Sequence, residues 1–383
     1  MPALVGGFGN TKNSIFIKYF NNKKDNPIDY YLRQLMFTSS FVSFSNSGVF
    51  KLKSSNKNCC VTLDKKDNII YNTDVLGSYL AGLIEGDGTF AIHNKESIAK
   101  KYYPMIIVVL KKNDLPLAQF LQNITKCGNI YIKKDRGYVL WQIQDVVSVF
   151  TIVNLINGKM RTPKIEALKR TIDWLNKYIE LNKLSNLPKT NLILSKIHQI
   201  ELKSLDKSPI ESNSWLAGFT DADGNFSINI HKRTNKKSTR VQLYYRLEIR
   251  QTYHRLDSEE NKTSFFSIMS ILANFLNVNV YSRSRCLNNK QYYSYTIIAQ
   301  NKNSLNIIVK YFLNYPLLSS KFLDFKNWLY ILEQKIEISQ HLNNQRLPNS
   351  FLDEATKIRK DFNKTRTTYN WDHLKNCYLI KID

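Results

Sequence analysis

Apolar and polar residues alternate along several stretches of the chain, and strict alternation predicts a β-strand with one buried face. The second half of the chain contains four stretches of this kind, at 225–231, 242–250, 279–285 and 291–298. Apolar residues at helical spacing precede the first stretch, occupy 265–276, and return after residues 304 and 319. The predicted order is therefore α-β-β-α-β-β-α, with the last helix split in two.

The first half of the chain predicts the same order, and an internal repeat explains why. Residues 79–90 read YLAGLIEGDGTF, and residues 215–226 read WLAGFTDADGNF. Strands are predicted near 88–95, 102–111, 129–135 and 138–144. We therefore expect two diverged copies of one unit. The predicted divisions are an N-terminal extension (1–73), a first unit (74–183), a linker with one short helix (184–211), a second unit (212–338) and a basic C-terminal extension (339–383).

Each unit is predicted to be α+β, with a four-stranded antiparallel sheet and helices on one face. The other face is polar, and it contains Asn, Gln, Ser, Thr, Arg, His and Tyr rather than Lys and Glu. A solvated surface would explain polarity alone. These side-chain types also pair with base edges in the DNA major groove, which admits a two-stranded ribbon. The candidate nucleic-acid contacts are Thr89, His93, Tyr131, Lys133, Gln142, Gln144, Asn225, Ser227, Asn229, His231, Lys232, Arg233, Arg240, Gln242, Tyr244, Arg246, Glu248, Arg250, Tyr281, Arg283 and Arg285.

The composition narrows the choice of partner. The 383 residues include 55 Lys and Arg against 31 Asp and Glu, which gives a formal net charge of +24. Such an excess favours a polyanionic partner, with nucleic acid ahead of an acidic membrane surface. No apolar run approaches the roughly 18 residues of a membrane-spanning helix, and no signal peptide is evident. Five scattered cysteines match neither zinc spacing nor a disulfide framework, which favours a reducing compartment.

The two repeated helices have small residues on one stripe. Gly82 and Gly86 are four residues apart, and Gly218 and Ala222 have the same spacing in the second copy. A glycine inside a helix costs about 1 kcal/mol relative to alanine, so the stripe needs a compensating use. Close packing of the two helices against each other is the simplest one. We expect this packing to join the two units.

Each repeated helix ends at an acid followed by glycine, and pseudo-twofold packing would bring these acids, Asp87 and Asp223, together. Two adjacent carboxylates repel each other, and one becomes protonated unless a cation binds with them. Oxygen ligands at a nucleic-acid surface favour Mg²⁺, which can activate water for phosphodiester hydrolysis. Glu85 and Asp221, two residues earlier, are weaker candidates, with capping or surface charge as an equal alternative.

The two segments resemble the LAGLIDADG homing endonucleases in their single-chain, two-motif form. The resemblance covers about 74–338 and implies two sheets that form a DNA-binding saddle, with the two motif helices as the interface. It implies metal binding by Asp87 and Asp223 with the adjacent Gly86 and Ala222. Mg²⁺ is the expected ion, and other divalent cations can substitute for it. The implied reaction is double-strand cleavage that leaves short 3′ overhangs.

The resemblance also implies further catalytic residues. A basic residue is expected near each scissile phosphate, and Lys164 and Lys321 occupy that place at the start of the helix after each sheet. Plain phosphate contact or surface charge is the alternative for both lysines. Gln251, at the end of the second strand, matches a water-orienting polar residue. Lys112 stands at that place in the first unit, which puts symmetric chemistry in doubt.

The first ten residues, MPALVGGFGN, resemble a segment of cytochrome oxidase subunit one. The match implies a reading frame that continues from an upstream exon into an intron of a fungal mitochondrial gene. The abundance of Asn, Lys, Ile and Tyr fits an AT-rich genome. A mitochondrial location is therefore expected.

Three functions agree with these observations. A site-specific DNA endonuclease, acting as a monomer on a long asymmetric site in an intronless allele, explains both acids. An RNA-binding intron maturase, alone or in addition, would use the extensions, and residues 357–375 could add a basic helix. A DNA-binding protein without cleavage activity is favoured only by the Lys112 departure. A membrane partner no longer competes, because paired carboxylates call for a metal ion and a phosphodiester.

Overall fold

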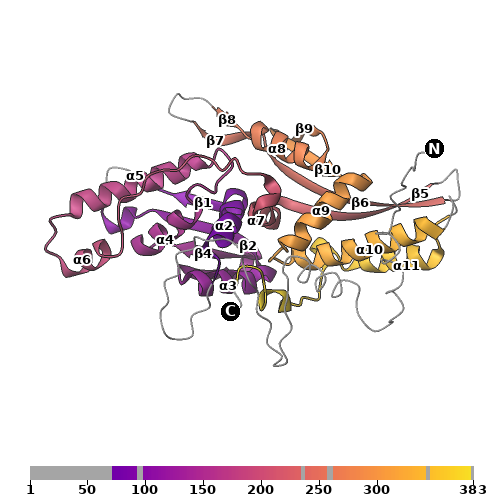
Figure 1. The fold of residues 1–383 in the computed structure, drawn as a ribbon, viewed down its shortest axis with the longest axis horizontal. Helices are drawn as coiled ribbons and strands as arrows, with labels where there is room; N and C mark the ends of the chain where they lie inside the picture. The colour runs from indigo at the N-terminus through magenta and orange to yellow at the C-terminus, as the bar shows by residue number, and fades with distance from the viewer. Residues whose placement is uncertain (1–70, 93–97, 234–237, 257–261, 342–345, 381–383) are drawn as a thin grey trace, which may run out of the picture. The chain divides into compact units, whose positions relative to one another are not determined.

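The computed structural model describes residues 71–92, 98–233, 238–256, 262–341 and 346–380 (Figure 1). All of them belong to one compact unit of the chain, Val61–Ile382. The segment 1–10, almost all of the predicted N-terminal extension, and His93 lie outside the described residues. The side chain of Arg233 is also outside the description.

The first half follows the predicted order of elements. Its helices and strands are α2 (Thr73–Asp87), β1 (Gly88–Ala91), β2 (Met105–Lys111), α3 (Leu115–Thr125), β3 (Asn129–Lys133), β4 (Tyr138–Ile143), α4 (Val146–Ile156) and α5 (Ile165–Asn182). The four strands form one antiparallel sheet in the order β1-β2-β4-β3. A short helix, α6 (Pro188–Leu194), follows on the way to the second half.

The second half repeats this arrangement. Its elements are α7 (Trp215–Asp223), β5 (Gly224–Arg233), β6 (Ser238–Arg250), α8 (Phe266–Leu276), β9 (Val280–Leu287), β10 (Lys290–Ala299), α9 (Lys302–Asn314) and α10 (Lys321–His341). The sheet order is β5-β6-β10-β9, which is the counterpart of the first sheet. The registers also correspond, because Gly88 pairs with Val108 and Gly224 pairs with Leu247. The predicted α+β fold of two pseudo-symmetric units is confirmed.

One element was not predicted. Between β6 and α8 the chain forms a two-stranded hairpin, β7 (Thr252–Leu256) and β8 (Lys262–Ser264). In the first half the corresponding strand, β2, leads through a single 3₁₀ turn at Lys112–Asp114 directly into α3. The hairpin therefore makes the two halves unequal.

The apolar faces of both sheets pack under helices, as the alternation predicts. Phe226 and Tyr245 from the second sheet are fully buried and contact Phe312 and Trp328 from the helices. Full burial of one large apolar side chain contributes roughly 1.5–3 kcal/mol. Trp141 and Trp174 fill the first half in the same way. The sheets are therefore anchored on one face, and the polar face remains available.

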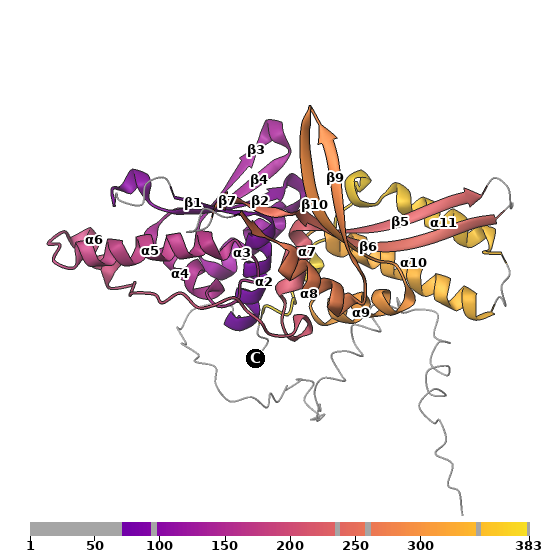
Figure 2. The same ribbon diagram turned by 90° about the horizontal axis from the view of Figure 1, so that it is seen from above.

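The two motif helices α2 and α7 lie side by side, in the views of Figures 1 and 2 alike. A Cβ atom added to Gly82 would lie 2.0 Å from the Trp215 carbonyl oxygen, and one added to Gly218 would lie 2.0 Å from the Tyr79 carbonyl oxygen. No side chain larger than hydrogen fits at that separation. The small-residue stripe is therefore explained by backbone-to-backbone contact between the halves.

The segment after α10 differs from the predicted basic helix. A helix, α11 (Asn349–Lys360), packs on α10, and the chain then continues without a long helix (Figure 1). Arg366 is buried in an ion pair with Asp324, at 2.8 Å, rather than exposed on a basic surface. Ile380 forms a β-bridge with Tyr71 at the start of α2. Among the helices that the structure describes, none has the length and apolar character needed to span a lipid bilayer.

Candidate active site between the motif helices

The ends of α2 and α7 meet at one cavity of about 410 Å³. Asp87 and Asp223, the last residues of the two helices, both line it. A Cβ added to Gly86 would lie 3.1 Å from the Asp223 carboxylate, so a small residue at 86 makes the approach possible. The structure therefore brings the two acids together, as the pseudo-twofold packing of the motif helices requires.

The two acids perturb each other and two lysines, of which Lys164 lines the cavity and Lys321 binds the end of α7. Burial, and then the Asp223 charge, raise the pKa of Asp87 to about 6 from an ordinary 3.8, although Lys321 and Lys164 oppose the rise. Burial also raises the pKa of Asp223, again against the two lysines. Burial lowers the pKa of Lys164 to about 8 and lowers that of Lys321 as well. Opposed pKa shifts in one cleft are typical of a functional site.

Each lysine binds the end of one motif helix. The Lys164 ammonium donates to the carbonyls of Ile84 (3.0 Å) and Gly88 (2.8 Å). The Lys321 ammonium donates to the carbonyls of Thr220 (2.9 Å) and Ala222 (2.7 Å). The Ile84 and Thr220 carbonyls also accept the Gly88 and Gly224 amides, and the C-terminal end of a helix favours a nearby cation. Both lysines thus lie beside the acids, which favours a role for them at this site over plain surface charge.

Glu85 and Asp221 neither cap a helix nor face solvent. Glu85 is buried and accepts from the Arg161 and Thr162 amides, at 2.9 and 2.6 Å, and from the Trp215 indole at 2.5 Å. Burial raises its pKa, and these hydrogen bonds oppose the rise. The carboxylate therefore joins α2 to α7 and to the turn that precedes Lys164.

Asp221 has the equivalent role in the second half. It accepts from the Tyr79 hydroxyl (2.7 Å), the Leu318 amide (2.8 Å) and the Ser319 hydroxyl (2.5 Å). The turn before Lys321 is thereby fixed to α7. The sequence offered one signal for this role, because both acids recur two residues before the paired aspartates.

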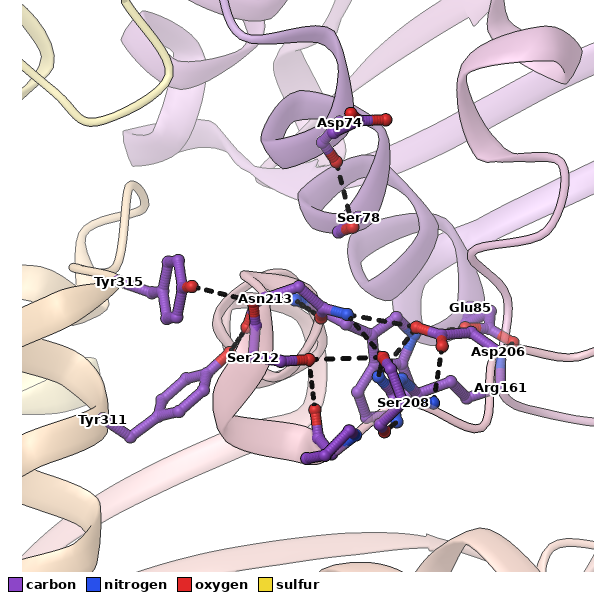
Figure 3. Close-up of polar contacts among 12 residues, drawn as sticks. Asp74, Ser78, Glu85, Arg161, Asp206, Ser208, Ser212, Asn213, Tyr311 and Tyr315 are labelled. Atoms are coloured by element: carbon purple, nitrogen blue, oxygen red, sulfur yellow. Dashed lines mark hydrogen bonds and ion pairs between the residues drawn. The ribbon is translucent and has the colours of Figure 1, made fainter. Parts of the chain in front are cut away.

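A polar cluster holds the linker (184–211) against the turn that precedes Lys164 (Figure 3). The buried Arg161 guanidinium forms an ion pair with Asp206 at 2.7 Å and donates to the Ser208 carbonyl at 2.7 Å. Asn213 donates to Asp206 at 3.1 Å, and its own side-chain oxygen accepts from the Trp215 amide at 3.0 Å. The linker is therefore tied to both the Lys164 turn and the start of α7.

Gln251 is not among the residues that line the cavity. Its amide donates to the Ser282 hydroxyl at 2.6 Å, toward β9. The preceding residue, Arg250, lines the cavity instead, and its charge acts on Asp223 and Lys164. Lys111 occupies the matching place in the first sheet and acts on Asp87. A one-residue shift in a strand reverses the face, so Arg250 and Gln251 fall on opposite faces, and the water-orienting role of Gln251 stays a prediction.

Most of the predicted nucleic-acid contacts that the structure describes lie on the polar faces of the sheets, whereas Lys232 follows His231 on β5 and falls on the opposite face. Glu248 is central in the second sheet, where it accepts from Arg285 (2.6 Å), Arg283 (3.4 Å) and Ser294 (2.9 Å). In the first sheet, Gln142 donates to Gln144 at 2.8 Å. Thr89 is exposed and lines the cavity. The exposed or partly exposed candidates include Tyr131, Lys133, Asn225, Ser227, Asn229, His231, Lys232, Arg240, Gln242, Tyr244, Arg246 and Tyr281.

The donor set fits a divalent cation of the magnesium type. Within the described ranges, no three His, Cys, Asp or Glu side chains gather to hold a metal. Asp87 and Asp223 provide two carboxylates, and the Gly86 and Ala222 carbonyls retain a second lone pair beside their lysine contacts. Mg²⁺ commonly binds one or two carboxylates together with waters and substrate phosphates. The burial of both acids also favours a compensating charge.

Comparison with known proteins agrees with this geometry. A model of the LAGLIDADG endonuclease family matches residues 80–175 and 216–332. The chain is 42% identical over 390 residues to the intron-encoded DNA endonuclease aI3 of Saccharomyces cerevisiae, a match that covers 99% of this chain and 82% of that protein. It is 27% identical over 296 residues to an uncharacterized cox1 intron-2 protein of Schizosaccharomyces pombe, over 76% and 75% of the two chains.

A solved structure extends the likeness to the fold. The meganuclease I-SmaMI, bound to uncleaveable DNA, matches with a TM-score of 0.53 at 18% identity, over 79% of this chain and 100% of that one. The family match includes both motif helices and most of both sheets. The paired helices and repeated sheets are both accounted for by this relationship. The chain belongs to the LAGLIDADG endonuclease family, in its two-motif, single-chain form.

Proposed function

We propose that this protein is a magnesium-dependent homing endonuclease that makes a double-strand break with short 3′ overhangs at a long asymmetric DNA site. The observation that supports it most is the cavity in which Asp87 and Asp223 meet, with Lys164 beside them and Lys321 at the end of α7. A DNA-binding protein without cleavage activity would not need two half-buried acids that repel each other.

The protein groups divide the work of hydrolysis. Asp87 and Asp223 would hold Mg²⁺, and the bound ion supplies an activated water and a Lewis acid. Lys164 and Lys321 stabilise negative charge that develops on the phosphate. The lowered pKa of Lys164, about 8, lies closer to neutrality than that of a free lysine, which suits proton transfer to a leaving oxygen. Glu85 and Asp221 position the two lysine turns.

The polar sheet faces would hold duplex DNA, with the protein acting as a monomer because both halves are in one chain. Arg246 and Gln242 on β6 have the donors that base edges and phosphates accept. We also propose a mitochondrial location, which the likeness to a cox1 intron protein supports. The target is then the joined exon sequence of the intronless host gene.

The test uses the full chain and a duplex that spans the joined exons, with the intron-interrupted duplex as a control. Cleavage is expected with Mg²⁺ and none with EDTA. Asp87→Asn and Asp223→Asn should each abolish double-strand cleavage while DNA binding survives. Asp353→Asn, an exposed position on α11, should cleave normally. Full cleavage by either active-site variant would overturn the proposal.

A maturase role is the alternative, alone or in addition. The exposed residues Lys357, Arg359 and Lys360 in the last turn of α11 lie outside the cavity and would suit RNA phosphates. Splicing of the host intron RNA with purified protein tests it directly. Acceleration by Asp87→Asn as well as by the natural chain would show a maturase activity separate from cleavage.

A further inference from the structure

The β7–β8 hairpin supplies one side of the catalytic cavity, and it belongs to the second half alone. Tyr253, His254 and Arg255 of β7 line the cavity together with Asp87, Asp223 and Lys164. In the first half, β2 enters α3 through a single turn, so the described residues there offer no equivalent side chains. The two halves therefore contribute different side chains to the cavity.

His254 is placed as a base rather than as another cation. Its ring packs edge-to-face on Tyr253, with ring centres 4.6 Å apart, and one side remains exposed. The charges that shift its pKa most are those of Arg255, Arg250, Lys164 and Arg170, all positive. Partial burial and these charges lower its pKa, which favours the neutral imidazole near pH 7, and a neutral imidazole has one ring nitrogen that can accept a proton.

We propose that His254 is a further catalytic residue, which accepts the proton of the attacking water at one of the two scissile phosphates. The inference rests on the proposed endonuclease function and adds an asymmetry to it. One DNA strand is cut with the help of the imidazole, and the other strand is cut without it.

The step balances as a hydrolysis. The water oxygen bonds to phosphorus while its proton passes to the imidazole. The bond between phosphorus and the leaving sugar oxygen breaks, and that oxygen takes a proton from the Lys164 ammonium. The imidazolium then returns its proton to solvent, and Lys164 regains one. No oxidant, reductant or further reactant is required.

The experiment follows each strand separately in supercoiled plasmid containing the target, at saturating protein in single turnover. General-base catalysis contributes roughly 10²–10⁴-fold. His254→Ala should therefore slow one strand by about 100-fold or more and leave the other within about 3-fold, so that nicked circle accumulates in place of linear DNA. Free imidazole should restore the slow strand, because removal of the ring leaves space in the cavity.

The matched control is His198→Ala, which removes an exposed imidazole that contacts Phe150 away from the cavity. It should cut both strands normally and show no response to imidazole. Equal slowing of both strands by His254→Ala, or no rescue by imidazole, would overturn the assignment. Absence of cleavage by the natural chain would instead contradict the endonuclease function itself, so the two failures can be told apart.

Discussion

The Asp87 carboxylate is held where its charge is unfavourable to the folded state. Its pKa of about 6 exceeds the ordinary 3.8, so folding favours the protonated form. Below about pH 4, Asp87 is protonated in the folded and the unfolded chain, and its pKa shift has no effect on stability. Between pH 4 and 6 the shift progressively lowers the free energy of unfolding, and above pH 6 the loss is complete. The folded protein therefore loses stability at neutral pH because it keeps the charged Asp87 carboxylate in the cavity.

Asp87→Asn should therefore stabilise the metal-free protein while it removes cleavage. One pKa unit corresponds to about 1.4 kcal/mol, so the gain in unfolding free energy at pH 7.5 should reach up to about 3 kcal/mol. At pH 4 the gain should be close to zero. Urea unfolding at both pH values, in EDTA, measures it. Asp353→Asn on exposed α11 serves as the control, and an Asp87→Asn variant less stable at pH 7.5 would contradict the argument.

Sequence alone identified the residues that repeat and missed those that depend on geometry. Asp87 and Asp223 recur in matching contexts, and their meeting follows from one symmetry argument. Gln251 was expected beside the acids, whereas Arg250 lines the cavity, because the sequence at the end of β6 does not reveal which side chain turns into it. Glu85 and Asp221 recur as plainly as the aspartates, but their burial depends on turns more than 70 residues away.

The contact between α2 and α7 depends on the absence of side chains. At Gly82 and Gly218 the neighbouring atoms are main-chain carbonyls, which cannot move aside as a flexible side chain can. The glycine penalty of about 1 kcal/mol in each helix is thus the cost of joining the two halves. The same closeness places the two acids in one cavity.

Gly82→Ala and Gly218→Ala should each destabilise the protein by more than about 2 kcal/mol and separate the acids, with a loss of cleavage larger than the loss of DNA binding. Gly137→Ala is the matched control. It has open space around it and a φ of +67°, so only a backbone penalty of about 1 kcal/mol is expected. Thermal unfolding and cleavage rates are the measurements. Equal effects at all three positions would contradict tight helix packing.

The strands of both sheets and the helices that cover them were predictable, because apolar residues recur in each with the period of a strand or a helix. The β7–β8 hairpin was not, since Thr252–Leu256 has no clean alternation and pairs only locally. The predicted basic helix at 357–375 was wrong beyond Lys360, because buried contacts such as that of Arg366 with Asp324 fix an irregular path. Tertiary contacts therefore determined the parts without periodicity.

At the scale of the whole molecule, the net charge of +24 predicts how strongly DNA binding depends on salt. A duplex held by many Lys and Arg side chains releases counterions on binding, so log K should fall with log salt at a slope of about −5 or steeper. Arg246→Gln, on the polar face of β6, should reduce the slope by about 1. Lys189→Gln, on α6, should leave it unchanged. A nearly flat dependence would argue against DNA on the sheet faces.

The β-bridge between Ile380 and Tyr71, together with the hydrogen bond from the Asn72 amide to the Leu379 carbonyl at 3.1 Å, has a consequence for biosynthesis. The start of the first motif helix is completed by residues translated some 300 codons later. A growing chain that has not yet reached Leu379 therefore contains both acids but lacks the contacts that complete the start of α2.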